Sequence, residues 1–266
     1  MAESRKPIAV ILSHLQAATF LRGVEHHTEI ASTNDRALEL CADVELLVPF
    51  LVLADHQTAG RGRGANRWWS SDGAILFSVI VDVAEYGLPE SRCPQISLTA
   101  GAAVCQTLQE MLGSEGTVGL KWPNDVWLNG RKAAGILVEI PAARRGRLVI
   151  GVGLNVNNSF EAAPPELRPL ATSMRDETGI ESDRLDVLVR LMKQLDDDLR
   201  GLANGGDALA QRWRSLCVLR DRTVSLDAGP QRVTGLCLGI ADDGALRLQT
   251  SSGEQRHFGG VVSRIV

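Results

Sequence analysis

The sequence predicts an α+β fold, in which a mixed or antiparallel sheet carries helices on one face and is followed by a small C-terminal β-barrel of SH3-like size. Three observations indicate this fold. Strand-like apolar segments follow one another through hairpin turns, most clearly at Asn129-Gly130, and such connections favour antiparallel pairing. Longer segments such as Ile96–Leu112 repeat apolar residues at the helical period. After Arg220 the chain consists of short strands separated by glycine-containing turns.

Residues 1–112 are expected to alternate strands and helices. Little motif content precedes Thr28, and Ile8–Leu21 is expected to form at most one helix or strand. Ser32 to Asp35 offers side chains that cap helices, and Ala74–Val83 has the β-branched and apolar residues of a central strand. The expected elements are an extended segment at Thr28–Thr33, a helix at Arg36–Leu47, strands at Leu51–Asp55 and Ala74–Val83, and a helix at Ile96–Leu112.

Strand patterns return after Val118 and give way to two helices. Val126–Leu128 and Arg131–Ile140 flank the Asn-Gly dipeptide that favours a type I′ hairpin turn. A second turn at Arg144-Arg145-Gly146 leads into a strand over Leu148–Asn155. The proline-rich segment Ala162–Pro169 is expected to be an irregular loop. The expected helices are Leu185–Leu202, which is amphipathic, and Ala208–Val218.

The C-terminal segment has a different character, which predicts a second domain. Its expected short strands are Thr223–Leu226, Arg232–Ile240, Ala245–Thr250, Gln255–Phe258 and Val261–Ile265. Five strands within so short a segment suggest a small β-barrel. We therefore predict two domains, residues 1–219 and residues 220–266.

The composition is that of a globular protein with a substantial core. The 266 residues are 44% hydrophobic and carry a formal net charge of −4, which argues against a dedicated nucleic-acid binder. The five cysteines form no Cys-x-x-Cys pair and no zinc-binding pattern, so we expect them to be reduced and the protein to be cytoplasmic. No apolar segment is long enough for a membrane span.

The most informative segment is the loop at residues 57–69. Gly60, Gly62 and Gly64 alternate with Arg61 and Arg63, and an arginine and two tryptophans follow. Glycines allow positive φ angles and a close approach of the backbone to a ligand. Arginines donate paired hydrogen bonds to carboxylates and phosphates, and tryptophans supply flat apolar cover. The loop therefore suits a small anionic ligand with an apolar body.

Four segments, taken in order, resemble the biotin–protein ligase family. They are Ser-Thr-Asn at 32–34, Gln-Thr-Ala-Gly-Arg-Gly-Arg at 57–63, Lys-Trp-Pro-Asn-Asp at 121–125 followed by Gly-Arg-Lys-x-Ala-Gly-Ile-Leu-Val-Glu at 130–139, and Gly-x-Gly-x-Asn at 151–155. The resemblance runs from about residue 28 to the C-terminus. It implies a catalytic domain similar to class II synthetases and a reaction in two steps. Biotin and ATP form biotinyl-5′-adenylate, and a lysine of biotin carboxyl carrier protein then accepts the biotinyl group.

The resemblance also implies a biotin pocket, whose residues would be Ser32, Thr33, Asn34, Gln57, Gly60, Arg61, Gly62, Arg63, Lys132 and Gly135. The ureido ring of biotin needs donors and acceptors, and the neutral polar side chains of this set supply both. Ser32, Thr33 and Asn34 could alternatively be plain helix-capping residues, and one residue could serve both purposes.

For ATP and the adenylate, the implied residues are Arg61, Arg63, Trp68, Lys121, Asn124, Asp125, Lys132 and Asn155. Lys132 matches the family lysine that bridges carboxylate and phosphate, and Arg63 and Asp125 complete the implied catalytic set. Asp125 is expected either to position Mg²⁺ or to help deprotonate the acceptor lysine. Gly151 and Gly153 could equally reflect tight strand packing, and Trp69 and Trp127 are assigned to packing.

One departure from the family pattern concerns the loop. The family often reads Gly-Arg-Gly-Arg-Arg-Gly-Arg, whereas this chain continues with Gly64-Ala65-Asn66 after the first four residues. The glycines are expected to make residues 60–64 a mobile lid that protects the adenylate from water.

The N-terminal length and the family resemblance indicate which partners to expect. Only 31 residues precede Ser32, which leaves no room for a DNA-reading module, so we expect a monofunctional ligase that binds neither DNA nor membranes. The expected acceptor is the carrier domain of acetyl-CoA or pyruvate carboxylase, and a homodimer is possible. One alternative is a lipoate–protein ligase, which has a similar catalytic fold. The other is a non-enzymatic binder of single-stranded nucleic acid through residues 60–69.

Overall fold

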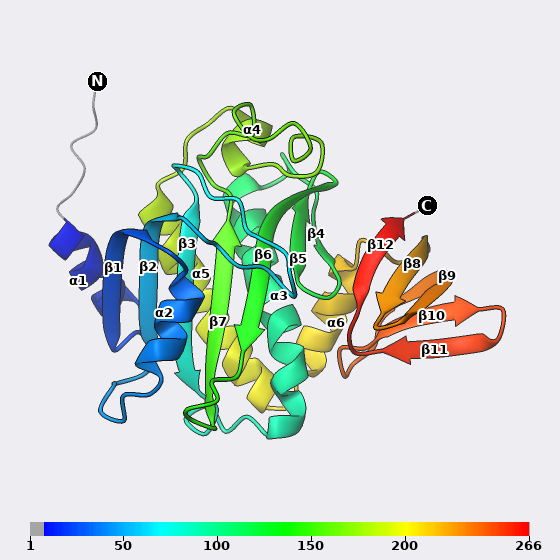
Figure 1. The fold of residues 1–266 in the computed structure, drawn as a ribbon, viewed down its shortest axis with the longest axis horizontal. Helices are drawn as coiled ribbons and strands as arrows, with labels where there is room; N and C mark the ends of the chain where they lie inside the picture. Colours follow the sequence, from blue (N-terminus) through cyan, green and yellow to red (C-terminus); the bar gives the residue numbers. More distant parts are fainter. Residues whose placement is uncertain (1–7, 266) are drawn as a thin grey trace.

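Two β-sheets and a layer of helices make up the structure, a computed structural model that describes residues 8–265 (Figure 1). The helices are α1 (Ile8–Ala18), α2 (Thr33–Leu40), α3 (Ile96–Leu112), α4 (Met174–Thr178), α5 (Arg184–Ala203) and α6 (Asp207–Leu216), with a short 3₁₀ helix at Glu90–Gln95. The first sheet contains β1 (Gly23–Ile30), β2 (Phe50–Gln57), β3 (Ile75–Asp82), β4 (Val118–Lys121), β5 (Asp125–Leu128), β6 (Arg131–Glu139) and β7 (Arg147–Leu154). The second contains β8 (Thr223–Ala228), β9 (Gln231–Ile240), β10 (Leu246–Thr250), β11 (Gly253–His257) and β12 (Val261–Ile265).

The first sheet is mixed, as the sequence predicts. Its strand order is β1-β2-β3-β7-β6-β5-β4, and β1 and β2 pair in parallel while the other neighbours are antiparallel. The β5–β6 hairpin turns at Asn129 and Gly130, whose φ angles are 49° and 80°. Positive φ at both central residues is the signature of the expected type I′ turn.

Helices cover this sheet unequally. The long helices α3 and α5 pack on one face, where residues such as Val79 and Ile150 join the main core, and Figure 1 shows both helices behind the sheet. The α+β class is therefore confirmed. The short helix α2 lies on the opposite face, where its Ala37 packs with Val52 and Val149 in a second, smaller cluster. This second face also carries the cavity described below.

Helix α2 differs from its predicted bounds, since it begins three residues before Arg36 and ends at Leu40 rather than at Leu47. The buried guanidinium of Arg147 explains the early end. It donates hydrogen bonds to the carbonyl oxygens of Asp43 (2.9 Å) and Leu46 (3.0 Å), so these carbonyls face the sheet instead of continuing a helix.

The C-terminal strands form a five-stranded antiparallel sheet in the order β11-β10-β9-β8-β12, consistent with an SH3-like domain. It is joined to the first sheet by specific contacts. The indole of the buried Trp122 donates to the carbonyl oxygen of Gly244 (3.0 Å), and Leu120 of β4 forms an isolated bridge with Cys217, just before the second sheet. Among the described helices, none has the length and apolar character needed to cross a membrane.

Candidate active site

A cavity of about 390 Å³ opens on the α2 face of the first sheet. Its walls come from the start of α2, the segment 61–69, the turn between β4 and β5, the strands β6 and β7, and residues 260–262 of the second sheet. The predicted site residues that line it are Ser32, Thr33, Asn34, Gln57, Arg61, Gly62, Arg63, Trp68, Lys121, Asn124, Asp125, Lys132, Gly135 and Asn155, so Gly60 alone of the predicted set does not. Residues from five separate segments thus meet at one place.

One end of the cavity is polar but uncharged. The backbone N–H and the hydroxyl of Thr33 lie 2.7 and 3.1 Å from Oε1 of Gln57, an arrangement that fixes the amide of Gln57 and leaves its two N–H donors for another partner. Ser32 caps α2, because its hydroxyl accepts from the backbone N–H of Asp35 (3.4 Å). The capping interpretation is therefore correct for Ser32, whose side chain also lines the cavity.

Asn34 is held deeper in the same wall. Its Oδ1 lies 2.5 Å from the hydroxyl of Ser78, and its Nδ2 donates to Glu139 (2.8 Å). A Cβ atom on Gly151 would lie 1.9 Å from Oδ1 of Asn34, so only glycine leaves room for this side chain. Ser78 was not predicted, although a lone serine inside the apolar strand β3 is a signal that could have identified it.

Segment 60–69 is folded into a small hydrogen-bonded hairpin. Arg61 and Arg67 form a bridge, and the backbone N–H of Gly62 donates to the carbonyl oxygen of Asn66 (2.8 Å). Within this hairpin only Gly64 has a positive φ, of 66°. Gly62 instead allows the two arms of the hairpin to approach each other closely, because a Cβ there would lie 3.2 Å from Cβ of Asn66.

Two of the three arginines of this hairpin, Arg61 and Arg63, contact protein groups through their side chains. The guanidinium of Arg61 forms two hydrogen bonds with Glu139, at 3.0 and 2.6 Å, and approaches Asp35 at 2.8 Å. The hydrogen bond to Glu139 raises the pKa of Arg61. Arg63 donates to the carbonyl oxygen of Gly260 (2.5 Å), which ties the hairpin to the turn before β12. The charge of Arg61 is thus compensated by carboxylates, whereas Arg63 keeps its charge because its partner is a neutral carbonyl.

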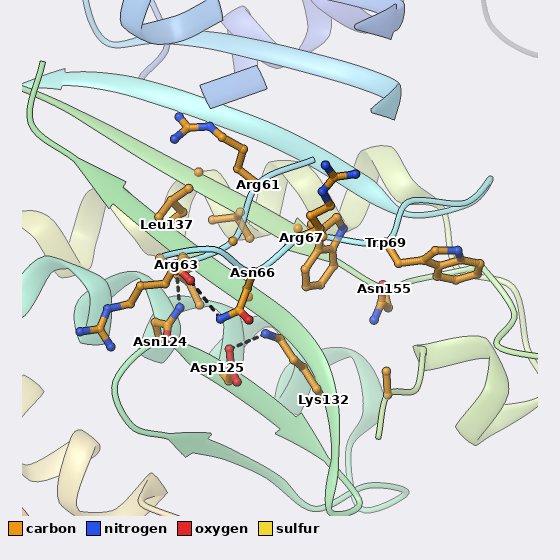
Figure 2. Close-up of a pocket in the computed structure, with 18 of the residues that line it drawn as sticks. Arg61, Arg63, Asn66, Arg67, Trp69, Asn124, Asp125, Lys132, Leu137 and Asn155 are labelled. Atoms are coloured by element: carbon orange, nitrogen blue, oxygen red, sulfur yellow. Dashed lines mark hydrogen bonds and ion pairs between the residues drawn. The ribbon is translucent and has the colours of Figure 1, made fainter. Parts of the chain in front are cut away.

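The opposite end of the cavity is cationic. Nζ of Lys132 lies 2.6 Å from Oδ1 of Asp125, and Figure 2 shows this pair at some distance from the guanidinium of Arg61. Burial lowers the pKa of Lys121, whose ammonium group sits 5.1 Å from the ring centre of Trp127. Trp127, assigned to packing, therefore packs against a predicted site residue.

Trp68 packs closely against two glycines that are paired across β6 and β7. A Cβ atom on Gly153 would lie 2.4 Å from the indole, and one on Gly135 would lie 3.0 Å from it. Nζ of Lys132 is 5.5 Å from the centre of the ring. The indole N–H is buried and has no protein partner. Gly153, like Gly151, is therefore required by the close packing of a cavity-lining side chain.

Two predicted asparagines use their amides within the protein. Asn124 donates to the carbonyl oxygen of Ile136 (2.9 Å). Asn155 donates to the carbonyl oxygen of Thr172 (3.0 Å) and accepts from Asn158 (3.1 Å). Oδ1 of Asn124 keeps its capacity to accept a hydrogen bond, whereas the buried Asn155 amide is bonded at both ends, which favours a supporting role for Asn155.

Comparison with known proteins agrees with this geometry. A family model described as the biotin/lipoate A/B protein ligase family matches residues 28–157, and one described as the biotin protein ligase C-terminal domain matches residues 221–261. The bifunctional ligase/repressor BirA of Bacillus subtilis is 34% identical over 242 residues, which cover 88% of this chain and 71% of that protein. This chain belongs to the biotin–protein ligase family. The resemblance noted in the sequence is therefore confirmed.

Two further proteins are similar to this chain, one of them with a solved structure. A biotin–[acetyl-CoA-carboxylase] ligase of Mycobacterium tuberculosis is 36% identical over 224 residues, 83% of this chain and 80% of that protein. The biotin protein ligase of Aquifex aeolicus in complex with biotin and ATP is 28% identical, with a TM-score of 0.79 over 92% of this chain and all of that chain.

The family implies a magnesium ion, and the donor groups of the cavity fit one. Asp125 is the carboxylate among the residues that line the cavity, and Oδ1 of Asn124 lies on the neighbouring residue. The described residues hold no cluster of three or more His, Cys, Asp and Glu side chains that would bind a metal alone. A single carboxylate that shares Mg²⁺ with substrate phosphates is the usual arrangement for this ion.

Proposed function

We propose that this chain is a biotin–protein ligase that activates biotin with ATP and transfers the biotinyl group to a lysine of biotin carboxyl carrier protein. One observation carries the proposal. A single cavity joins an uncharged hydrogen-bonding end at Thr33 and Gln57 to a cationic end at Lys132. Biotin has the same two ends, an uncharged ureido ring and a carboxylate, and its carboxylate must meet a phosphate.

At the uncharged end, the ureido ring is proposed to bind Ser32, Thr33 and Gln57. The free N–H donors of the Gln57 amide suit the ureido carbonyl oxygen, and the hydroxyl groups suit the ring N–H groups. Loss of one such partner in a buried site costs about 1–3 kcal/mol, so these groups would discriminate against a ligand without a urea, such as lipoate.

At the cationic end, Lys132 and Arg63 are proposed to neutralise the two anions that must approach each other. In the first step a carboxylate oxygen of biotin attacks the α-phosphorus of ATP and pyrophosphate leaves. Lys132 lies beside the carboxylate of Asp125, so it is held in place before the substrates arrive. Asp125, with Asn124, would hold Mg²⁺, which supplies charge neutralisation on the phosphates.

In the second step the acceptor lysine must be neutral, because only a free amine can attack the adenylate carbonyl. The amine nitrogen forms the amide bond, AMP leaves with the bonding electrons, and the amine gives up a proton. Asp125 is proposed to receive that proton or to favour its loss, as an alternative to its role with Mg²⁺. The hairpin 60–69 would exclude water during the interval between the steps.

The proposal extends to the acceptor protein, the cellular compartment and the domain division. The acceptor is proposed to be the carrier domain of acetyl-CoA or pyruvate carboxylase, with no binding to DNA. The described cysteines are all free, which suits the cytoplasm. We also propose a division into a catalytic domain, residues 1–219, and a C-terminal domain, residues 220–266, that closes one side of the cavity through residues 260–262.

The proposal is tested by incubating the purified chain with ATP, Mg²⁺, a carrier domain and labelled biotin or labelled lipoate. We expect pyrophosphate release with biotin alone and label on the carrier lysine when the carrier is added. Label from lipoate but not from biotin would assign the chain to the other activity of the wider family. Release of no pyrophosphate with either acid would reject an adenylating enzyme.

A further inference from the structure

We propose that Glu139, the last residue of β6, is a positioning residue that fastens the hairpin 60–69 to the wall of the biotin pocket. The inference rests on the proposed function and adds a residue to which no role has been given above. Glu139 is not among the residues that line the cavity, so it acts through the two side chains that it holds.

The contacts of Glu139 join two different elements. Its Oε1 accepts from Arg61 (3.0 Å), and its Oε2 accepts both from Arg61 (2.6 Å) and from Nδ2 of Asn34 (2.8 Å). Arg61 belongs to the hairpin and Asn34 to the first turn of α2. A single carboxylate therefore receives three hydrogen bonds, two of them from a guanidinium in the paired geometry that is strongest for carboxylates.

This contact lies at the end of a continuous hydrogen-bonded path. Gln57 accepts from Thr33, the hydroxyl of Ser78 lies within 2.8 Å of the Thr33 hydroxyl and 2.5 Å of Asn34 Oδ1, and Asn34 donates to Glu139. The path begins at the groups proposed to hold the ureido ring and ends at the hairpin. A ligand that orders Thr33 and Gln57 thereby favours the arrangement in which Glu139 holds the hairpin.

The charges around Arg61 define its role. The guanidinium faces two carboxylates, Glu139 and Asp35, so its positive charge is already compensated. Figure 2 shows Arg61 pointing away from Lys132 and Asp125. An anionic ligand at the cationic end gains little from this side chain. Arg61 thus connects the hairpin to the pocket wall through Glu139, in contrast to the ligand-binding role that the family resemblance implies for it.

The test uses the substitution Glu139→Gln, with Glu29→Gln as its matched control. The amide of glutamine carries one acceptor oxygen and one NH₂ group that only donates, so its NH₂ group must face a donor of Arg61 or Asn34, whichever way it turns. Glu29 is exposed and lies on β1, outside the cavity. For Glu139→Gln we expect the KM for biotin and the release rate of biotinyl-adenylate to rise by about tenfold, because a charge-assisted hydrogen bond is lost at an unchanged catalytic centre.

A double variant separates positioning from general destabilisation. In Arg61→Gln/Glu139→Gln two neutral amides can bond to each other, so we expect adenylate release to rise by less than the combined effects of Arg61→Gln and Glu139→Gln measured separately. A double variant that is no better than the sum of its parts would overturn the paired role, since independent sites are additive.

The outcomes distinguish the inference from the function on which it rests. An unsubstituted chain that forms no adenylate rejects the proposed function itself. An active chain in which Glu139→Gln behaves like Glu29→Gln overturns the inference alone. If Glu139→Gln fails to fold, Glu139→Asp decides, because it keeps the charge but is one methylene too short to reach both partners. Rapid adenylate release from Glu139→Asp supports the inference, and release at the unsubstituted rate overturns it.

Discussion

The packing of Trp68 on Gly153 leads to a prediction in which a single methyl group weakens nucleotide binding and spares biotin. In Gly153→Ala the new Cβ would lie 2.4 Å from Cε2 of the indole, where ordinary contacts begin at 3.4 Å, so the indole must move by about 1 Å. It cannot slide along the sheet toward Gly135, where the fit is already close at 3.0 Å. The free direction is outward, into the cavity that Trp68 lines.

The size of the loss in ATP affinity depends on what already fills the cavity beside Trp68. Without nucleotide, the indole can relieve the overlap by moving into an empty cavity. We propose, as the family resemblance implies, that the nucleotide binds against Trp68, so that with nucleotide bound the same displacement would meet the ligand and the overlap would become a cost of binding. Overpacking of this kind costs about 1–3 kcal/mol, which corresponds to a rise in the Kd for ATP of about fivefold to a hundredfold. The hydrogen bonds between Thr33 and Gln57 at the biotin end do not involve the indole of Trp68, so the Kd for biotin should change little.

Titration calorimetry with ATP and with biotin, each added alone, measures both constants. Gly201→Ala is the matched control, since its Cβ would meet only Cδ1 of Leu209 at an ordinary 3.8 Å in the helix α5. Replacing Trp68 by phenylalanine in the Gly153→Ala background should restore part of the affinity by making room for the methyl group. An unchanged Kd for ATP in Gly153→Ala, or an equal loss for both ligands, would refute this account of the indole.

Three further predictions concern charged side chains. Lys132→Ala should lower biotin-dependent pyrophosphate exchange by at least about a hundredfold with the fold intact by circular dichroism, because the loss of the ammonium group leaves the two substrate anions without this cation and leaves the carboxylate of Asp125 unpaired beside them; exchange at the normal rate would exclude this role. Arg63→Gly should shorten the lifetime of bound adenylate, measured by rapid filtration, since the hairpin loses its bond to Gly260; an unaltered lifetime would count against it. The hydrogen bond from Arg36 holds the pKa of Glu25 below its usual 4.5, despite the partial burial of this carboxylate. The ion pair therefore stabilises the folded state fully above pH 4.5, and this stabilisation is lost as the pH falls through the lowered pKa. Glu25→Gln should therefore flatten the acid dependence of urea unfolding, and an identical acid dependence would show that this carboxylate contributes nothing.

Much of the fold could be predicted from the sequence, because the signals involved are local. The Asn129-Gly130 turn and the helix Ile96–Leu112 have the bounds that pattern alone indicates. The predicted bounds are wrong where a residue far away in the sequence determines where an element ends. The end of α2 is set by Arg147, which lies more than 100 positions later in the sequence and takes the carbonyls that a longer helix would need. Nothing within residues 36–47 carries that information.

The site shows the same limit. Its motif residues could be assembled from their order in the chain, and Lys132 and Asp125 do meet in one cavity. The partners of these residues could not be predicted, because they depend on register between strands. Glu139 is the last residue of the Gly-Arg-Lys-x-Ala-Gly-Ile-Leu-Val-Glu motif, yet the motif does not indicate its partner. The hydrogen bond to Arg61 forms only because β6 places Glu139 against the hairpin. The contact between Arg63 and Gly260 joins residues 197 positions apart and has no local signature.

The distribution of charge in the cavity indicates where the anions bind. Six charged residues line it, and five are cations: Arg61, Arg63, Arg67, Lys121 and Lys132, against the single carboxylate Asp125. Glu139 and Asp35, outside the lining, compensate Arg61, so four cations of the lining remain against its one carboxylate. Their excess of three positive charges suits a triphosphate that also brings Mg²⁺. The compensation of Arg61 thus has a consequence for orientation, because a guanidinium that faces two carboxylates offers no net positive charge to the carboxylate of biotin, which is therefore directed toward Lys132.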